Sequence, residues 1–511
     1  MGERLHRTGD PLSRETIVER EAQLDSSGVG SADQPGEVLI LGAGFSRAIS
    51  RHLPLANGLG AEAFERARKS APGLFDEAIR VTDAYPFEVW LSLLAEDQPH
   101  LEEGANRMNA ARFAKLSDAI VAVLGEAQEQ ALADEAPVWL YELLSVLHYR
   151  RCSVISLNYD TLIEVGINSM HLGSSRNGTP WPLPIDDSIG AFAYIPSQGT
   201  TVDDVLRGQP PVSQLAARAS ELDQTLRLLK LHGSLGWWWA PDDQSGATLA
   251  REQTSSTFGN PVVMSNEERS LALPGREPFI VPPLAGKSRF FRNPLTRQLW
   301  RDAYRVLSNA TRIALVGYSL PQTDHVMAGM LASALRASNA DVEIVNPDGD
   351  DVAARVVALG GPSRDSEQMT YFDSEACVED YARALCDRSA AGLVGPISRL
   401  TPIYRSQDPD PAGVAWSYRG QRVNHRVVSL ERRVDGELIV DTEEGIDFSV
   451  DPSDTRPTTR ELISSLEGVT RLVARAPNGR EATIVAFETP NFENRNARHV
   501  LYLIPAGQLV G

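Results

Sequence analysis

The sequence predicts an α/β fold: a Rossmann-like parallel sheet with a helical insert, followed by a small mostly-β C-terminal domain. Apolar runs such as VLIL at 38–41 end abruptly in glycine or polar residues, as buried parallel strands do. Segments of helical composition separate these runs. Beyond residue 413, short apolar runs are instead separated by Asp435-Gly436 and Asn478-Gly479, which are strong hairpin signals.

The chain divides by composition into four parts. We predict a flexible tail at 1–35, an α/β domain at 36–394, a linker rich in proline and aspartate at 395–413, and a β domain at 414–511. The helical insert is expected at about 61–150, between the first and second strands, with helices at 87–95 and 110–147.

Composition limits the kinds of partner. The 511 residues carry 49 basic and 68 acidic side chains, a net charge of −19, so the bulk surface gains nothing from releasing phosphate counterions. Nucleic acid is therefore not an expected partner. No apolar run approaches the roughly 18 residues of a membrane span, and no signal-peptide core is present. The three cysteines form neither a disulfide framework nor a zinc pattern, so we expect a cytoplasmic protein without membrane contact.

The first strand leads directly into a glycine turn. Glycine permits a sharp turn and lets a phosphate approach the backbone, where the amides at the start of the next helix can hold it. A plain tight turn is the alternative. The candidate ligand-binding residues of this turn are Gly42, Ala43, Gly44, Phe45, Ser46 and Arg47.

Polar residues also follow the next two predicted strands. Asn158 and Asp160 come after the strand at 152–157, and His232 follows the strand at 228–231. Open α/β sheets bind ligands at the carboxyl ends of their strands. The alternatives are an Asn/Asp cap on the following helix and a hydrogen-bonded structural histidine.

Two later strand ends complete the series. The strand at 313–316 is followed by Gly317, Tyr318 and Ser319, with Asp324 close behind, and the strand at 342–345 is followed by Asn346. We expect all five strand ends to contribute to one ligand-binding site at the same end of the sheet.

Taken in this order, the five strand ends resemble the sirtuin-like, silent-information-regulator-type family of NAD-consuming proteins. The resemblance covers about residues 36–390, and the tyrosine of Asn158-Tyr159-Asp160 and the segment GYSLP at 317–321 are similar to the bacterial branch found in anti-phage defence. It implies that NAD is the substrate and that Ser319 and Asn346 meet its adenosine side.

The sequence departs from two related patterns. Residues 233–316 contain no cysteine, so the four-thiolate zinc site of the protein deacetylases of this family is not expected. An NAD-dependent dehydrogenase would need a third glycine near Arg47 and an acidic residue at the end of a second strand some 20 positions on, and residues 53–67 do not form a strand pattern.

The chemistry of NAD assigns roles to the site residues. The bond between nicotinamide and ribose breaks with a neutral leaving group, so no acid is needed to expel it. Asn158 can hold the ribose hydroxyls and position water, and a histidine pKa of about 6.5 suits His232 to general-base work. Asp160 can stabilise developing positive charge or orient its neighbours.

The expected function is therefore an NAD glycohydrolase that releases nicotinamide and ADP-ribose, as an NAD-depleting effector of anti-phage defence. We expect a homo-oligomer, or a partner or trigger protein bound through the C-terminal domain, and no metal. Two alternatives remain open: a module that binds NAD or ADP-ribose without turnover, and an ADP-ribosyl or acyl transferase acting on protein. The trigger and the use of NADP are also open.

Overall fold

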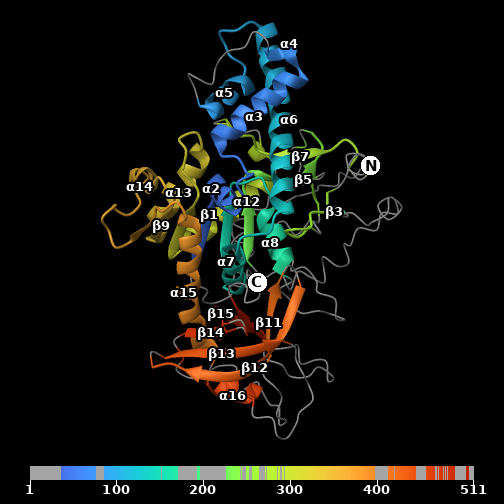
Figure 1. Ribbon diagram of the computed structural model, residues 1–511. Helices are drawn as coiled ribbons and strands as arrows, with labels where there is room; N and C mark the ends of the chain where they lie inside the picture. Colours follow the sequence, from blue (N-terminus) through green and yellow to red (C-terminus); the bar gives the residue numbers. More distant parts are fainter. Residues whose placement is uncertain are drawn as a thin grey trace, which may run out of the picture. The chain divides into compact units, whose positions relative to one another are not determined.

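The protein is represented by a computed structural model, in which helices and strands are labelled in Figure 1. The structure describes residues 36–75, 86–150, 152–170, 193–195, 226–241, 243, 249–252, 256–263, 271, 273–284, 286–287, 290–292, 294–397, 413–418, 421–434, 436–444, 456–465, 469, 471–475, 477, 479, 481–488 and 502–505. The predicted tail at 1–35 and most of the predicted linker at 395–413 lie outside these residues.

Six parallel strands form the central sheet in the order β10-β9-β8-β1-β2-β4. Their bounds are β1 Glu37–Leu41, β2 Ser153–Ser156, β4 Arg227–Lys230, β8 Arg312–Val316, β9 Asp341–Val345 and β10 Met369–Phe372. If the six strands are renumbered 1 to 6 in chain order, they follow the Rossmann order 3-2-1-4-5-6 across the sheet. The order in which the chain adds strands reverses between β1 and β8. The predicted fold class is confirmed.

The two faces of β1 explain its uninterrupted apolar sequence. Leu39 and Leu41 belong to a core with helices α7 (Val138–Tyr149) and α15 (Cys377–Ile397). Val38 and Ile40 belong to a second core with α12 (Pro294–Ser308) and α13 (His325–Ser338). Successive side chains of a strand point to opposite faces, so the sheet is the middle layer of an α/β/α sandwich.

Helices occupy most of the chain between β1 and β2, as predicted. They are α2 Ala43–Ile49, α3 Ala56–Ser70, α4 Pro72–Phe75, α5 Phe87–Ala95, α6 Glu103–Ala133 and α7. The single helix predicted at 110–147 is wrong, because α6 ends at Ala133 and α7 begins after Pro137. Proline lacks the amide hydrogen that a continuous helix would need there.

A second sheet continues directly from the first. Its strands are β3 Ala193–Ile195, β6 Ala250–Glu252, β5 Gly233–Trp239 and β7 Glu277–Ile280, in the order β3-β6-β5-β7. Only Leu231 and His232 separate β4 from β5. At Gly233 the φ angle is +79°, and a Cβ would lie 2.1 Å from the Phe279 carbonyl oxygen, so this junction requires glycine.

The C-terminal strands form a closed barrel, drawn in orange and red in Figure 1. They are β11 Gly413–Tyr418, β12 Gln421–Arg432, β13 Glu437–Glu444, β14 Arg471–Arg475, β15 Glu481–Glu488 and β16 Tyr502–Pro505, with helix α16 Thr459–Ser465 between β13 and β14. The two predicted hairpins are the antiparallel pairs β12–β13 and β14–β15. Gly436 and Gly479 both have positive φ, as such turns require.

None of the helices that the structure describes combines the length and the hydropathy needed to cross a lipid bilayer.

Candidate functional site

The predicted glycine turns and polar residues lie at the same end of the central sheet. Gly42, Asn158, His232, Gly317 and Asn346 follow β1, β2, β4, β8 and β9, within two residues of the last residue of each strand. Parallel strands end at a common edge, and β1 and β8 are the pair at which the strand order reverses. This is the position at which open α/β sheets bind their ligands.

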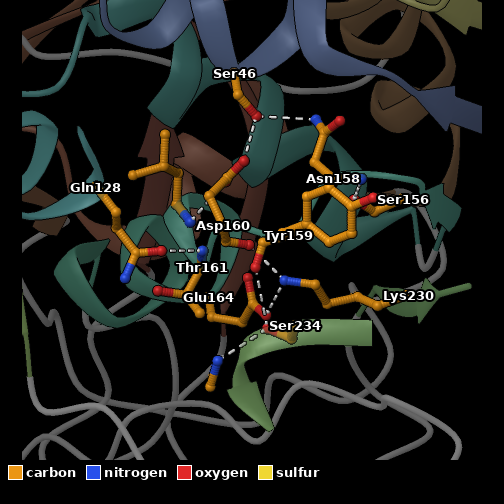
Figure 2. Close-up of polar contacts among 12 residues, drawn as sticks. Ser46, Gln128, Ser156, Asn158, Tyr159, Asp160, Thr161, Glu164, Lys230 and Ser234 are labelled. Atoms are coloured by element: carbon orange, nitrogen blue, oxygen red, sulfur yellow. Dashed lines mark hydrogen bonds and ion pairs between the residues drawn. The ribbon is translucent and has the colours of Figure 1, made fainter. Parts of the chain in front are cut away.

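Asn158 and Asp160 are tied to the glycine turn through Ser46 (Figure 2). The Ser46 hydroxyl donates to Asp160 Oδ2 over 2.6 Å and accepts from Asn158 Nδ2 over 2.9 Å. Asn158 Nδ2 also donates to the Gly42 carbonyl over 2.8 Å. Both amide hydrogens are thus directed into the protein, which leaves Oδ1 as the atom of Asn158 that can accept from a ligand.

Asp160 also caps the following helix, which was the alternative interpretation of this residue. Its Oδ1 accepts from the Leu162 amide over 3.2 Å, at the start of α8 (Leu162–Met170). Burial raises the pKa of this carboxyl, while the Lys230 ammonium and the Ser46 hydroxyl lower it in part. Asp160 therefore caps a helix with one oxygen and fixes Ser46 with the other.

Lys230 is a site residue that the sequence analysis did not identify. Its amino group is buried and donates to the Asp160 carbonyl oxygen and, over 2.9 Å, to Glu164 Oε1 (Figure 2). A charged residue inside the apolar run LLKL was the available signal, since a buried lysine requires a partner. The pair holds the start of α8 against the end of β4.

His232 lies in a second buried cluster. The amino group of Lys287 lies 3.2 Å from His232 Nε2 and 3.0 Å from Asp324 Oδ1. The Tyr318 hydroxyl donates to Asp324 Oδ2 over 3.1 Å. His232 is 6% exposed and Asp324 is 3% exposed. Tyr318 and Asp324 were predicted to bind the ligand; the structure places Asp324 beside His232 and Tyr318 in contact with Asp324.

The environment of His232 differs from the one expected of a free histidine. Burial and the Lys287 ammonium lower its pKa to about 4, against the opposing effect of Asp324. Burial would raise the pKa of Asp324, but His232, Lys287 and the Tyr318 hydroxyl outweigh it and hold that pKa below its ordinary value. The resting cluster therefore contains a neutral imidazole beside an ammonium–carboxylate pair.

Two aromatic rings flank the imidazole. The Tyr159 ring is roughly stacked with it, with centroids 6.5 Å apart and an interplanar angle of 28°, and the Trp300 ring lies 6.5 Å away at 44°. The Tyr159 hydroxyl donates to the Val281 carbonyl over 2.7 Å, which fixes its ring. Because Tyr159 stands between Asn158 and Asp160 in the chain, it connects the two clusters.

The glycine turn after β1 packs against the glycine turn after β8. A Cβ on Gly44 would lie 2.8 Å from Gly317 Cα, and one on Gly317, where φ is +61°, would lie 2.1 Å from the Phe45 nitrogen. The amides of Gly42, Gly44 and Phe45 donate to the carbonyls of Val316, Gly317 and Gly42. These glycines therefore serve backbone packing, and the predicted phosphate contact stays a prediction.

The remaining predicted residues have mostly structural contacts. Phe45 is buried against Trp139 with ring centroids 5.9 Å apart, and Arg47 donates to the Leu53 carbonyl over 3.1 Å. The exposed Ser319 accepts from Arg355 through its carbonyl, and Asn346 Oδ1 accepts from the Asp348 amide over 3.0 Å. Ala43 begins α2. None of these contacts tests their predicted roles in binding NAD.

A cavity of about 530 Å³ opens beside this site. It lies between α6 and β5 and is lined by residues that include Glu126, Gln128, Thr161, Glu164 and Ser234. Asn158, Asp160 and His232 are not among its lining residues, so this cavity does not open on the imidazole.

Within the part of the chain that the structure describes, no three His, Cys, Asp or Glu side chains form a group that could hold a metal ion. Cys152, Cys377 and Cys386 are all buried, and none of the three forms a disulfide.

Comparison with known proteins gives a likeness among solved structures. No family model matches the chain, and no curated protein matches it. A solved structure described as "Structural Basis for the Mechanism and Regulation of Sir2 Enzymes" is similar, with 13% identity and a TM-score of 0.30, over 69% of this chain and 92% of that one. At that TM-score the likeness says nothing about activity, and the fold class rests on the strand order.

Proposed function

We propose that the protein is an NAD glycohydrolase, which converts NAD and water into nicotinamide, ADP-ribose and a proton. The observation that carries the proposal is the placement of Asn158 and His232 after the neighbouring parallel strands β2 and β4, with Tyr159 in ring contact with His232. The resemblance of the five strand ends to the sirtuin-like family supplies the substrate.

The residues at the carboxyl edge fit a dinucleotide in part. Open sheets commonly bind nucleotides where the strand order reverses, here between β1 and β8, and buried amide, carboxylate and imidazole groups follow the nearby strands β2 and β4. The glycine turn fits less well, because the Gly44 amide already donates to Gly317 over 2.9 Å. Phosphate bound at that turn would have to compete with this bond.

The residues of the chain would act on a substrate that already has a labile bond. NAD supplies a nicotinamide that leaves as a neutral molecule with the electron pair of its bond to ribose. Asn158 Oδ1 would accept a hydrogen bond from the ribose or the attacking water, since both hydrogens of its Nδ2 are engaged. His232 Nε2 would accept the proton that water loses as its oxygen bonds to the ribose carbon.

A second candidate is a module that binds NAD or ADP-ribose without turnover. It is favoured by one observation: in the described structure, the Nε2 atom that would act as the base already contacts Lys287. The same contact fits an enzyme in a resting state, and we rank that interpretation first because Asn158 and His232 both lie at the proposed site.

The biological role follows from the proposed activity. An enzyme that hydrolyses NAD would deplete its own cell, so we propose that it is an effector of anti-phage defence and is held in a weakly active state. A trigger can change that state only by binding its two conformations with different affinity. We assign this sensing, or assembly into a homo-oligomer, to the barrel of β11 to β16.

Product analysis distinguishes these functions. The purified full chain is incubated with NAD, and nicotinamide, ADP-ribose and remaining NAD are separated by chromatography, while binding is measured by calorimetry. The proposal predicts equal amounts of nicotinamide and ADP-ribose. Binding without nicotinamide release would support the sensor, and nicotinamide release with ADP-ribose attached to protein would support a transferase.

A further inference from the structure

Among the described residues, Lys287 is the nearest charged group to the imidazole of His232. It lies in the segment between β7 and the short 3-10 helix η4 (Phe290–Arg292), and its amino group is buried. One ammonium bridges two acceptors, His232 Nε2 at 3.2 Å and Asp324 Oδ1 at 3.0 Å. A buried lysine with two such partners is held in a single position.

The contacts define the tautomer of the imidazole. An ammonium can only donate hydrogen bonds, so Nε2 must offer its lone pair to Lys287. A neutral imidazole has one N–H, which must be on the ring nitrogen that does not offer its lone pair. The proton of the neutral ring is therefore on Nδ1.

We propose that Lys287 is a positioning residue that holds His232 as the neutral tautomer with its proton on Nδ1 and its Nε2 lone pair directed at the Lys287 ammonium. Its meaning for catalysis rests on the proposed NAD glycohydrolase function. The position of Lys287 and the tautomer of His232 are properties of this chain and need no substrate.

Asp324 completes the arrangement. It is the N-cap residue of α13, where an aspartate commonly accepts from the helix amides, yet its side chain makes no capping hydrogen bond. Its carboxylate accepts instead from Lys287 and Tyr318. Oδ2 also lies 3.8 Å from His232 Nε2, so Asp324 opposes the effect of Lys287 on the imidazole.

Charged and titratable groups on the surrounding elements are few in the described residues. Lys287 and Asp324 face the ring directly, Tyr159 is roughly stacked with it, and Tyr318 reaches it through Asp324. Glu88 of α5 interacts electrostatically with both tyrosines and bonds Thr323, next to Asp324. Lys287 is thus the one cation of this set.

The proposed role has a defined consequence for the reaction. His232 stays unprotonated well below neutral pH and remains available as a base. Its Nε2 can accept a proton from water only after the hydrogen bond from Lys287 to Nε2 has broken. Asp324 would keep Lys287 bound and balance the charge of the imidazolium that forms.

The test is the pKa and tautomer of His232, measured by nitrogen NMR of histidine-labelled full-length protein and assigned with a His232→Gln variant. Lys287→Met removes the cation and should raise the His232 pKa by at least about one unit. Asp324→Asn should lower it. The His232 pKa of the double variant should lie between those of the two single variants and above that of the wild type, because Lys287 affects it more than Asp324 does. Lys287→Arg should stay close to the wild type.

The double variant keeps the test decisive if Lys287→Met alone does not fold, since it leaves no unpaired buried carboxylate. Lys115→Met is the matched control, because Lys115 is exposed on α6 and pairs only loosely with Asp118 over 3.4 Å. An unchanged or lowered His232 pKa in folded Lys287→Met, or a wild-type ring with its proton on Nε2, would overturn the proposal.

Kinetics separate the two claims. If NAD is hydrolysed, kcat/KM of Lys287→Met should fall at least about twofold between pH 7.5 and 5.0, as expected when the pKa of the base rises from about 4 to about 5 or above. The wild type should change little over that range. The NMR result without NAD turnover would support this inference and refute the proposed function, while turnover without the predicted shifts would do the opposite.

Discussion

Replacing Ser46 with alanine should loosen the Asn158–Asp160 segment. The change removes a bond of 2.6 Å to the Asp160 carboxylate and a bond of 2.9 Å from Asn158. Hydrogen bonds to charged groups contribute about 1.5–3 kcal/mol and neutral ones about 0.5–1.5 kcal/mol. Asn158 keeps its bond to Gly42 and Asp160 keeps its bond to Leu162, so neither is stripped of partners. We therefore expect a loss of about 2–4 kcal/mol.

Hydrogen exchange read by mass spectrometry measures this loss locally, which avoids assuming that the barrel and the sheet unfold together. In Ser46→Ala, peptides covering 153–165 should exchange at least about 30-fold faster, the equivalent of 2 kcal/mol. Ser333→Ala is the matched control. It removes a bond of 3.0 Å to the Gly329 carbonyl on α13 and an exposed bond of 3.5 Å from Arg336, and should change exchange by less than about 0.5 kcal/mol.

The effect should also depend on pH with a defined sign. The Ser46 hydroxyl lowers the pKa of Asp160 against the larger effect of burial, so its removal raises the folded-state pKa further. The folded variant then binds a proton more readily, and the cost of the change should grow as pH rises through the titration of Asp160. Equal protection of the two proteins, or a cost that grows as pH falls, would refute this account of the network.

Three further changes test other parts of the structure. Gly317→Ala should destabilise the fold by at least about 3 kcal/mol in thermal unfolding, because its Cβ would lie 2.1 Å from the Phe45 nitrogen. Gly329→Ala is the control and should stabilise the fold slightly, because its Cβ would have nothing within 4 Å. Similar effects of the two changes would contradict the packing of the two glycine turns. Lys230→Met should cost about 3–5 kcal/mol by leaving Glu164 buried and unpaired, and adding Glu164→Gln should recover part of that loss; no recovery would contradict the pairing. NAD cleavage should withstand chelators, and metal analysis showing one zinc per chain that chelators remove with the activity would refute that expectation.

The sequence was sufficient where the physical signal is local. The apolar run at 38–41 predicts a strand buried on both faces, and α5 begins and ends at the residues expected from helical spacing. The strand ends bearing Asn158, Asp160 and His232 were identified because polar groups that interrupt an apolar run are visible in the sequence. The break between α6 and α7 was also local, and Pro137 was its overlooked signal.

The missing parts of the site depend on contacts between distant segments. Lys287 lies 55 positions from His232 in an irregular segment without periodicity, so nothing near it in sequence indicates its partner. The same holds for Gly44 and Gly317, whose turns pack on each other. The lowered pKa of His232 follows from burial beside Lys287, and for that reason the ordinary value near 6.5 was the wrong expectation.

The most direct test of the central claim is nicotinamide release by Asn158→Ala and His232→Ala in the full chain, with Ser333→Ala as the control. Circular dichroism and hydrogen exchange would establish that each variant is folded. If the two residues form the site that hydrolyses NAD, each change should reduce the rate of nicotinamide release by at least about 100-fold, while the control retains the wild-type rate. Wild-type nicotinamide release by folded His232→Ala would contradict the account.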